Sequence, residues 1–163
     1  MYATSGPTLI SQDDTFFKCD AGRLKLRAYP DGSGELIFYQ RENTGGPKTS
    51  SYEMVSTAVA DALRNVLIQA YGQVGRVKKE RTLYMVGRTR VHIDQVEGLG
   101  SFMELEVVLA EDESEDKGMR EAYELMAKLG IQEDALIDQA YVDLINSKTL
   151  GTSLGAHTAC LSA

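Results

Sequence analysis

Ionisable side chains occupy alternate positions in two neighbouring segments near the middle of the chain, within residues 88–109, RTRVHIDQVEGLGSFMELEVVL. Because side chains alternate between the two faces of a strand, each segment is predicted to be a β-strand with one apolar and one charged face. The charged positions are Arg90, His92 and Asp94 on the first strand and Glu104 and Glu106 on the second. Two carboxylates two positions apart can hold a hard divalent cation through oxygen. The alternative is an ordinary solvated outer face.

Basic residues show similar spacing in other predicted strands: Lys25 with Arg27, Lys79 with Arg81, and Arg41 and Arg90 singly. Strand by strand, such alternation is typical of the wet side of an antiparallel sheet. Taken together, cations and carboxylates on one shared surface suit a ligand that is polyanionic and metal-bound, such as a triphosphate. The sequence has no Walker-type loop, so we expect side chains to hold the phosphates.

The elements that would position these residues follow from hydrophobic periodicity and turn signals. Strands are predicted at residues 9–17, 22–27, 35–42, 50–55 and 74–86, ahead of the two strands within 88–109. Helices are predicted from Ser56 or Thr57 to Tyr71, and over residues 114–129 and 133–145. This order favours an α+β fold with an antiparallel sheet. If that sheet curves into a β-barrel, its charged faces line the lumen and helices flank the outside.

The composition is that of one globular domain, with 163 residues of which 43% are hydrophobic and 25% charged. No apolar run is long enough to span a membrane, and the N-terminus does not resemble a signal peptide. The two cysteines, Cys19 and Cys160, lack metal-ligand spacing, which favours a reduced, cytoplasmic location.

The net charge of −7 is unevenly distributed along the chain. Residues 1–91 carry 13 Lys and Arg against 9 Asp and Glu, whereas residues 92–163 carry 4 against 15. An acidic chain is a poor general binder of nucleic acid, so we expect no nucleic-acid partner and no membrane partner.

Several segments resemble, in order, the CYTH superfamily of class IV adenylate cyclases, thiamine triphosphatases and triphosphate tunnel metalloenzymes. They are DTFF, GRLKLR, ELIFYQRE, GPKTSSY, VKKERTLY, GRTRVHIDQVEGLGSFMELEVVL and the late LGI and AYVDLI. The resemblance runs from about Gln12 to Ile145, and RVHIDQVEGLGSFMELEV is its most specific part. It implies an eight-stranded antiparallel tunnel that binds a triphosphate and Mg²⁺ or Mn²⁺.

The resemblance also implies roles for single residues. The phosphate-binding residues would be Lys25, Arg27, Arg41, Lys79, Arg81 and Arg90, and those on the metal side would be Asp94, Glu104 and Glu106. The implied function is metal-dependent hydrolysis of inorganic tripolyphosphate or of an organic triphosphate such as thiamine triphosphate. The alternatives are cyclisation of ATP by a class IV cyclase-type mechanism and non-catalytic binding of triphosphate or polyphosphate.

One family feature has no match in this sequence. The family's N-terminal strand carries the pattern E-x-E-x-K, and MYATSGPTLISQ does not contain it. We therefore expect a CYTH-like domain over residues 9–146 that lacks this strand, with a gapped tunnel, and a flexible tail over residues 147–163. An unpaired strand edge favours self-association, so a homodimer is a further expectation, together with hydrolysis impaired by the missing strand.

Overall fold

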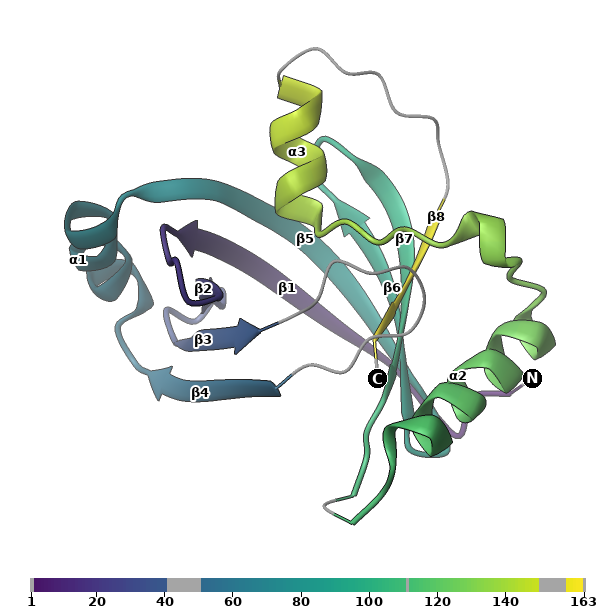
Figure 1. The fold of residues 1–163 in the computed structure, drawn as a ribbon. Helices are drawn as coiled ribbons and strands as arrows, with labels where there is room; N and C mark the ends of the chain where they lie inside the picture. The colour runs from purple at the N-terminus through teal and green to yellow at the C-terminus, as the bar shows by residue number, and fades with distance from the viewer. Residues whose placement is uncertain (1, 41–50, 111, 150–157, 163) are drawn as a thin grey trace.

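The computed structural model describes residues 2–40, 51–110, 112–149 and 158–162. In this part of the chain, strands form one sheet in the order β4-β3-β2-β1-β5-β6-β7-β8 (Figure 1). The strands are β1 (Ser5–Phe17), β2 (Arg23–Ala28), β3 (Gly34–Gln40), β4 (Ser51–Thr57), β5 (Gln73–Val86), β6 (Thr89–Val96), β7 (Gly100–Val107) and β8 (Thr158–Ser162). The pairings are antiparallel except that of β8 with β7, which is parallel.

The helices are α1 (Ala60–Tyr71), α2 (Glu115–Leu129) and α3 (Tyr141–Thr149), with a 3₁₀ turn, η1 (Glu133–Ala135), between the last two. The predicted α+β class with an antiparallel sheet and flanking helices is confirmed. Among the described residues, no helix is long and apolar enough to cross a membrane.

The sheet curls around a concave face (Figure 1). Directly paired residues share a face of the sheet, so the register identifies which side chains lie there. Asp14 pairs with Arg27, Arg81 with Asp94, and Arg90 with Glu106. In the described chain, β4 and β8 are the two edges of the sheet and do not pair with each other, so strand pairing leaves the barrel open. From the sequence the gap is expected at the N-terminal strand, whereas β1 lies inside the sheet and pairs with both β2 and β5.

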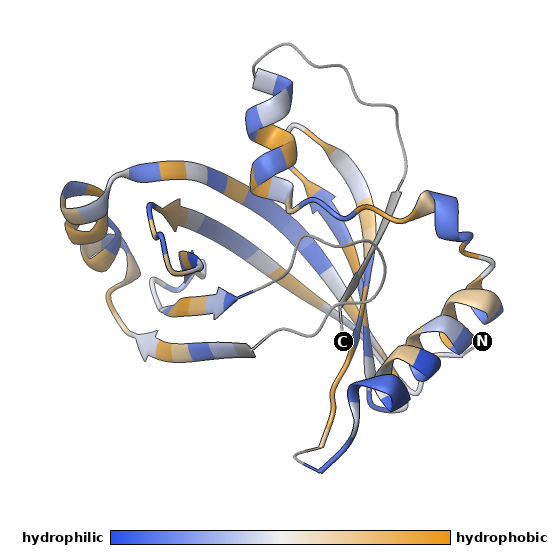
Figure 2. Ribbon diagram, in the orientation of Figure 1, coloured by the Kyte–Doolittle hydropathy of each residue, from blue (hydrophilic) through white to orange (hydrophobic). Residues whose placement is uncertain are grey.

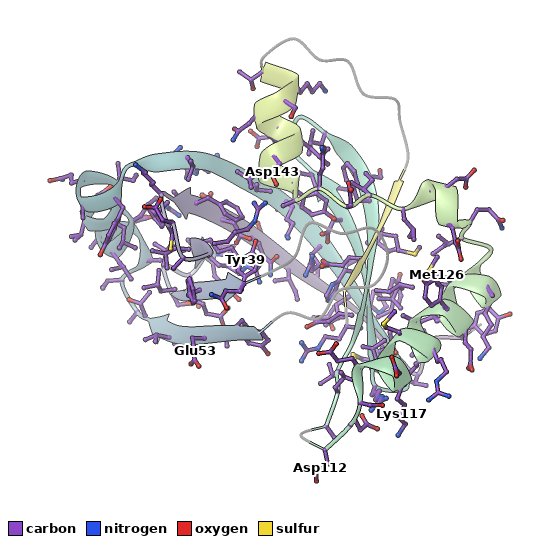
Figure 3. All side chains as sticks on the ribbon, in the orientation of Figure 1. Tyr39, Glu53, Asp112, Lys117, Met126 and Asp143 are labelled. Atoms are coloured by element: carbon purple, nitrogen blue, oxygen red, sulfur yellow. The ribbon has the colours of Figure 1, made fainter. Side chains whose placement is uncertain are left out.

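Two helices cover the convex face. On α1, Leu63, Leu67 and Ile68 pack against a cluster that contains Phe17 and Leu26. On α2, Ala122, Leu125 and Met126 pack on apolar residues of β6 and β7. Polar and apolar residues alternate along several strands (Figure 2). The side opposite α1 and α2 therefore carries many polar groups, together with an apolar cluster at one end. Figure 3 shows Met126 on the sheet side of α2 and Lys117 on its outer side.

α3 packs at one end of the concave face. Val142 is 4% exposed and lies in a cluster with Phe16, Val77 and Val96, all of which belong to that face. The α3 backbone comes close to the sheet because β5 has a glycine there: a Cβ on Gly75 would lie 2.4 Å from Val142 Cγ2. α3 therefore covers one end of the hollow, which is the space on the concave side of the sheet.

Two predicted helices differ in their bounds. The first begins at Ala60, because Ser56 and Thr57 pair with β3 as the end of β4. The predicted helix over residues 133–145 is instead η1, a link, and α3 from Tyr141. Leu136 packs with the α2 cluster while Ala140 packs with the α3 cluster, so a link, not a continuous helix, connects the two sites. In the tail, residues 147–149 belong to α3 and residues 158–162 to β8.

Candidate functional site

A buried carboxylate organises the cations of β2. Asp14, on β1, is 2% exposed and accepts hydrogen bonds from Lys25 Nζ at 2.9 Å and from Arg27 Nε and Nη2 at 2.8 and 2.9 Å. The Lys25 ammonium also lies 5.7 Å from the ring centroids of Phe16 and Tyr39. Both cations are thus held in one place by contacts on several sides.

A second buried carboxylate does the same on β5 and β6. Asp94 is 0% exposed and accepts two hydrogen bonds from Arg81, each at 2.7 Å. Lys79 Nζ lies 3.7 Å from Asp94 Oδ2, and the Tyr141 hydroxyl donates to the same oxygen at 3.1 Å. Since Tyr141 begins α3, the helix at the end of the hollow is bonded directly to the charged residues.

The third group contains the two glutamates of β7. Glu104 accepts a hydrogen bond from Arg81 Nη2 at 2.6 Å, and its Oε2 lies 3.4 Å from Nδ1 of His92. Glu106 lies 3.9 Å from Nε2 of the same imidazole and 3.3 Å from Arg90. The side chains of Glu104 and Glu106 remain 22% and 30% exposed, so both carboxylates are open to a ligand from the hollow.

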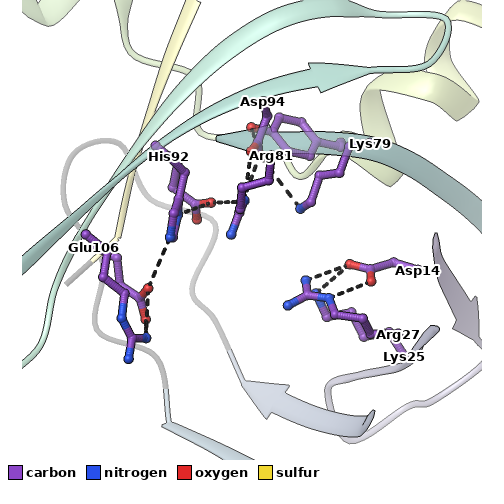
Figure 4. Close-up of polar contacts among 11 residues, drawn as sticks. Asp14, Lys25, Arg27, Lys79, Arg81, His92, Asp94 and Glu106 are labelled. Carbon is purple, nitrogen blue, oxygen red and sulfur yellow. Dashed lines mark hydrogen bonds and ion pairs between the residues drawn. The ribbon is translucent and has the colours of Figure 1, made fainter. Parts of the chain in front are cut away.

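These groups face one another across the concave face (Figure 4). Their charges are close enough to shift one another's pKa values. Burial would raise the pKa of Asp14, but Lys25, Arg27 and, more weakly, Lys79 hold it well below its usual value. Burial would also raise the pKa of Glu104, which Arg81 and His92 keep low. The carboxylates of Asp14 and Glu104 are therefore ionised at neutral pH.

The cations are affected in two ways. Burial lowers the pKa of Lys25 to about 8, although Asp14 opposes the effect. The pKa of Lys79 is lowered by burial and by its neighbour Arg81. The pKa values of Arg27 and Arg81 are raised, because their carboxylate partners outweigh burial. At neutral pH the concave face thus carries the ionised Asp14 and Glu104 beside the charged Lys25, Arg27 and Arg81.

The register and contacts bring together eight of the predicted site residues on the concave face: Lys25, Arg27, Lys79, Arg81, Arg90, Asp94, Glu104 and Glu106. Arg41 lies outside the described residues. Sequence reasoning missed Asp14 and Tyr141 and gave His92 no role. A hint was available for Asp14, since buried cations such as Lys25 and Arg27 need a nearby countercharge.

A separate hollow of about 600 Å³ lies on the convex side, where β1 and β5 meet α1. Its charged residues are largely bonded to each other: Arg76 donates to Asp13 at 2.7 and 2.5 Å, and Arg64 pairs with Asp61. Arg64 also donates to Thr15, which anchors α1 to β1. The predicted site residues, apart from Lys79, do not line this hollow.

The donor set suits a hard cation. Mg²⁺ typically binds through one or two carboxylates together with substrate phosphates and water. Glu104 and Glu106 provide two such carboxylates on one strand face. No group of three or more His, Cys, Asp or Glu in the described chain is arranged to hold a metal ion by itself. Phosphate oxygens of a ligand, together with water, would therefore complete the coordination shell.

Comparison with known proteins adds three findings. A family model described as the CYTH domain matches residues 4–141. A Methanocaldococcus jannaschii protein named "Putative adenylate cyclase" is 34% identical over 74 residues, which are 45% of this chain and 42% of that protein. Adenylate cyclase CyaB of Aeromonas hydrophila is 29% identical over 97 residues, which are 59% and 51% of the two chains. The chain thus matches about half the length of these relatives.

Solved structures show the same fold at low identity. A Pyrococcus horikoshii protein superimposes with a TM-score of 0.75 at 17% identity, covering 84% of this chain and 83% of that chain. A Pyrococcus furiosus protein gives a TM-score of 0.73 at 18% identity, with the same coverage.

Proposed function

The chain belongs to the CYTH domain family, and from this premise we propose that its concave face binds a triphosphate together with Mg²⁺ or Mn²⁺ and catalyses its hydrolysis. The observation that carries the proposal is the arrangement of cations and carboxylates on one face of one curved sheet. Lys25 and Arg27 come from β2, Lys79 and Arg81 come from β5, and all four face the same concave side.

The cations have distinct tasks in this proposal. Lys25 and Arg27 form one wall and bind phosphate oxygens from the β2 side, while Lys79 and Arg81 bind them from the β5 side. Arg90, which is 43% exposed, extends the basic surface towards Glu106. Charge-assisted hydrogen bonds in a partly dry site are stronger than in water, so a flexible polyanion is held in an extended, fixed position.

Glu104 and Glu106 would hold the metal ion. When bound, it neutralises phosphate charge and activates water. Arg81 donates to Glu104 in this structure, so it is placed to turn from Glu104 to a phosphate when the carboxylate is engaged elsewhere. Asp94 has both oxygens bonded by Arg81 and Tyr141. We therefore propose that Asp94 orients Arg81, whereas Glu104 and Glu106 bind the metal directly.

Hydrolysis makes the fewest demands on these residues. The oxygen of water attacks the terminal phosphorus, the bond from that phosphorus to the bridging oxygen breaks, and orthophosphate and diphosphate leave with release of a proton. Each step needs only charge neutralisation and orientation of the triphosphate, which the cations and carboxylates of the concave face supply. Tripolyphosphate and thiamine triphosphate share this chemistry, and the groups around the open side of the hollow would choose between them.

Cyclisation of ATP is the second candidate, since both matched relatives carry adenylate cyclase in their names. It uses the same contacts to the triphosphate but a ribose hydroxyl as the nucleophile, and diphosphate is the leaving group. The two reactions differ in product, which makes them easy to distinguish.

The test is a product assay on tripolyphosphate, thiamine triphosphate and ATP, each with Mg²⁺ and with Mn²⁺. The hydrolysis proposal expects orthophosphate from at least one substrate, with a metal requirement. Diphosphate and cyclic AMP from ATP alone would identify the cyclase instead. Binding of all three by calorimetry without turnover would leave a non-catalytic binder, and absence of binding would refute the proposed site. Glu121→Gln is the control variant and should keep wild-type binding and turnover. Glu121 bonds Arg88 and Thr89 on the α2 side of the sheet, so its loss removes a carboxylate away from the concave face.

A further inference from the structure

We propose that Asp14 is a positioning residue of the phosphate site: its carboxylate keeps the Lys25 ammonium charged and aimed, with Arg27, at the bound triphosphate. The inference rests on the proposed function and extends it to a residue that does not itself bind the polyanion. It starts from geometry, since Asp14 is 2% exposed and contacts both cations at 2.8–2.9 Å.

The surroundings of Lys25 explain why it needs this partner. The described groups that face it are Asp14 and the Phe16 ring on β1, Arg27 on its own strand, the Tyr39 ring on β3 and Lys79 on β5. Asp14 is the one carboxylate in that set, and two of the others are cations. Burial and the two cations oppose the charge on Lys25, whereas Asp14 supports it, and the resulting pKa is about 8.

The position of Asp14 also orients Arg27. Its two oxygens bond Nε and Nη2 of the guanidinium, which fixes the plane of the group. One of those oxygens bonds Lys25 as well, so the two cations are tied to a single point on β1. Lys25 has three N–H donors, and one of them is used by Asp14. The two remaining N–H groups can donate to phosphate oxygens.

A negative charge next to a polyanion is at first sight unfavourable, and this gives the proposal a specific signature. Replacing Asp14 by Asn removes a repulsive charge, so at low pH, where Lys25 stays protonated, the variant should bind tripolyphosphate as tightly as the wild type or more tightly. Loss of an opposite charge at hydrogen-bond distance lowers a lysine pKa by about 1–3 units. At pH 8 the variant should therefore have lost the Lys25 charge and bind more weakly.

The experiment measures the dissociation constant of inorganic tripolyphosphate by calorimetry from about pH 4 to about pH 10, without metal and at constant ionic strength. In the wild type, affinity should fall above about pH 8, by up to about tenfold per pH unit, the limit for one linked proton. In Asp14→Asn the midpoint should move down by about 1–3 pH units. Titration of the ligand itself cancels, because every variant meets the same ligand.

Asp13→Asn is the matched control. Asp13 adjoins Asp14 on β1 but lies on the convex face, where it bonds Arg76 and lies 3.6 Å from Arg64. Its substitution removes the same charge from the same strand and should leave the midpoint at its wild-type value. Asp14→Glu, which restores the carboxylate, should return the midpoint at least part of the way.

Lys25→Arg keeps the inference testable if Asp14→Asn does not fold. Arginine does not lose its proton in this range, so the fall in affinity above pH 8 should become smaller in Lys25→Arg, and any remaining fall belongs to Lys79, whose pKa is also lowered. In the double variant Asp14→Asn/Lys25→Arg, removal of Asp14 should shift the midpoint less than it does in the presence of Lys25. A wild-type profile that Lys25→Arg does not change, or a midpoint that Asp14→Asn does not move, would overturn the role of Asp14. Failure of the wild type to bind tripolyphosphate at any pH would instead refute the proposed function.

Discussion

On the concave face each carboxylate of the candidate site is paired with one or more cations. The exposed fraction of the carboxylate side chain divides these pairs into two kinds, buried and partly exposed. Asp14 and Asp94 are 2% and 0% exposed, with all their oxygens bonded to cations or to a hydroxyl. Glu104 and Glu106 keep side chains that are 22% and 30% exposed. Buried charges need partners, whereas partly exposed ones can exchange a partner for a ligand. The first pair is thus suited to orienting cations and the second to binding metal.

Substitution of Glu106 by Gln tests the metal role. The amide keeps the size of the side chain but removes the charge, so metal affinity should fall by about 1.5–3 kcal/mol, roughly tenfold or more. Tripolyphosphate binding without metal should persist, because a negative charge beside Arg90 has been removed. Titration of Mn²⁺ followed by its electron paramagnetic resonance signal measures the first effect and calorimetry the second. Unchanged Mn²⁺ affinity would show that Glu106 is not a metal ligand.

Substitution of Arg90 by Ala tests the phosphate role. Tripolyphosphate affinity should fall at every metal concentration, by at most about 1.5 kcal/mol because the side chain is 43% exposed and screened by water. The loss should shrink as salt is added. Arg88→Ala is the control, since Arg88 pairs with Glu113 and Glu121 beside α2. An equal loss in both variants would point to a general charge effect and not to a contact.

The sequence allowed the faces of most charged residues to be predicted, but not that of Asp14. Residues 23–27 alternate cleanly between basic residues and leucine, so Lys25 and Arg27 could be assigned to one face. Residues 77–81 are charged at four consecutive positions, and there the period of two places Lys79 and Arg81 together without showing which face they share. In β1, both Phe16 and Phe17 are apolar, and the structure buries one on each side of the sheet. The sequence pattern therefore does not show which residues of β1 face the concave side and which face the convex side. Whether Asp13 or Asp14 faces the hollow depends on tertiary pairing with β2 and β5.

At the level of elements, α3 links the end of the hollow to its charged residues. The helix packs through Val142 and bonds Asp94 through Tyr141, and Arg23 of β2 donates to Asp143 at 2.6 Å. These contacts connect α3 to strands on both sides of the concave face. Sequence periodicity placed a helix here but began it too early, because it does not reveal that Leu136 packs with α2 and Ala140 with α3.

Substitution of Gly75 by Ala tests how closely α3 must approach the sheet. The added Cβ would meet Val142 Cγ2 at 2.4 Å, so α3 must shift or the strand must bend, at a cost of about 1–3 kcal/mol in unfolding free energy. Denaturant unfolding measures that cost. Val142→Ala in the same chain should restore part of it, because the clashing methyl group is removed. Additive losses in the double variant would mean that the two residues do not meet.

Across the whole molecule, the open side of the sheet is its most distinctive feature. In the described chain, β4 pairs with β3 on one side, and its other side has no strand beside it. The strand exposes large apolar side chains on both faces: Tyr52 at 58%, Met54 at 49% and Val55 at 67%. Unpaired backbone groups next to exposed apolar side chains favour pairing with another chain. Tyr52 and Met54 belong to the concave face, so a partner strand here would extend the wall of the hollow.

We therefore expect a concentration-dependent homodimer in which the β4 edges of two copies meet. Val55→Lys places a charge on the edge strand and should shift the protein towards monomer, because edge lysines oppose strand pairing. Val66→Lys is the matched control: Val66 is 62% exposed but lies on α1, away from the edge. Sedimentation velocity over a range of protein concentrations measures the change. A wild type that stays monomeric throughout, or a dimer that Val55→Lys leaves intact, would show that β4 is not the contact. If the dimer does form through β4, tripolyphosphate affinity should rise with protein concentration in the wild type and remain constant in Val55→Lys. The reason is that the added strand would narrow the open side of the hollow and reduce its access to water.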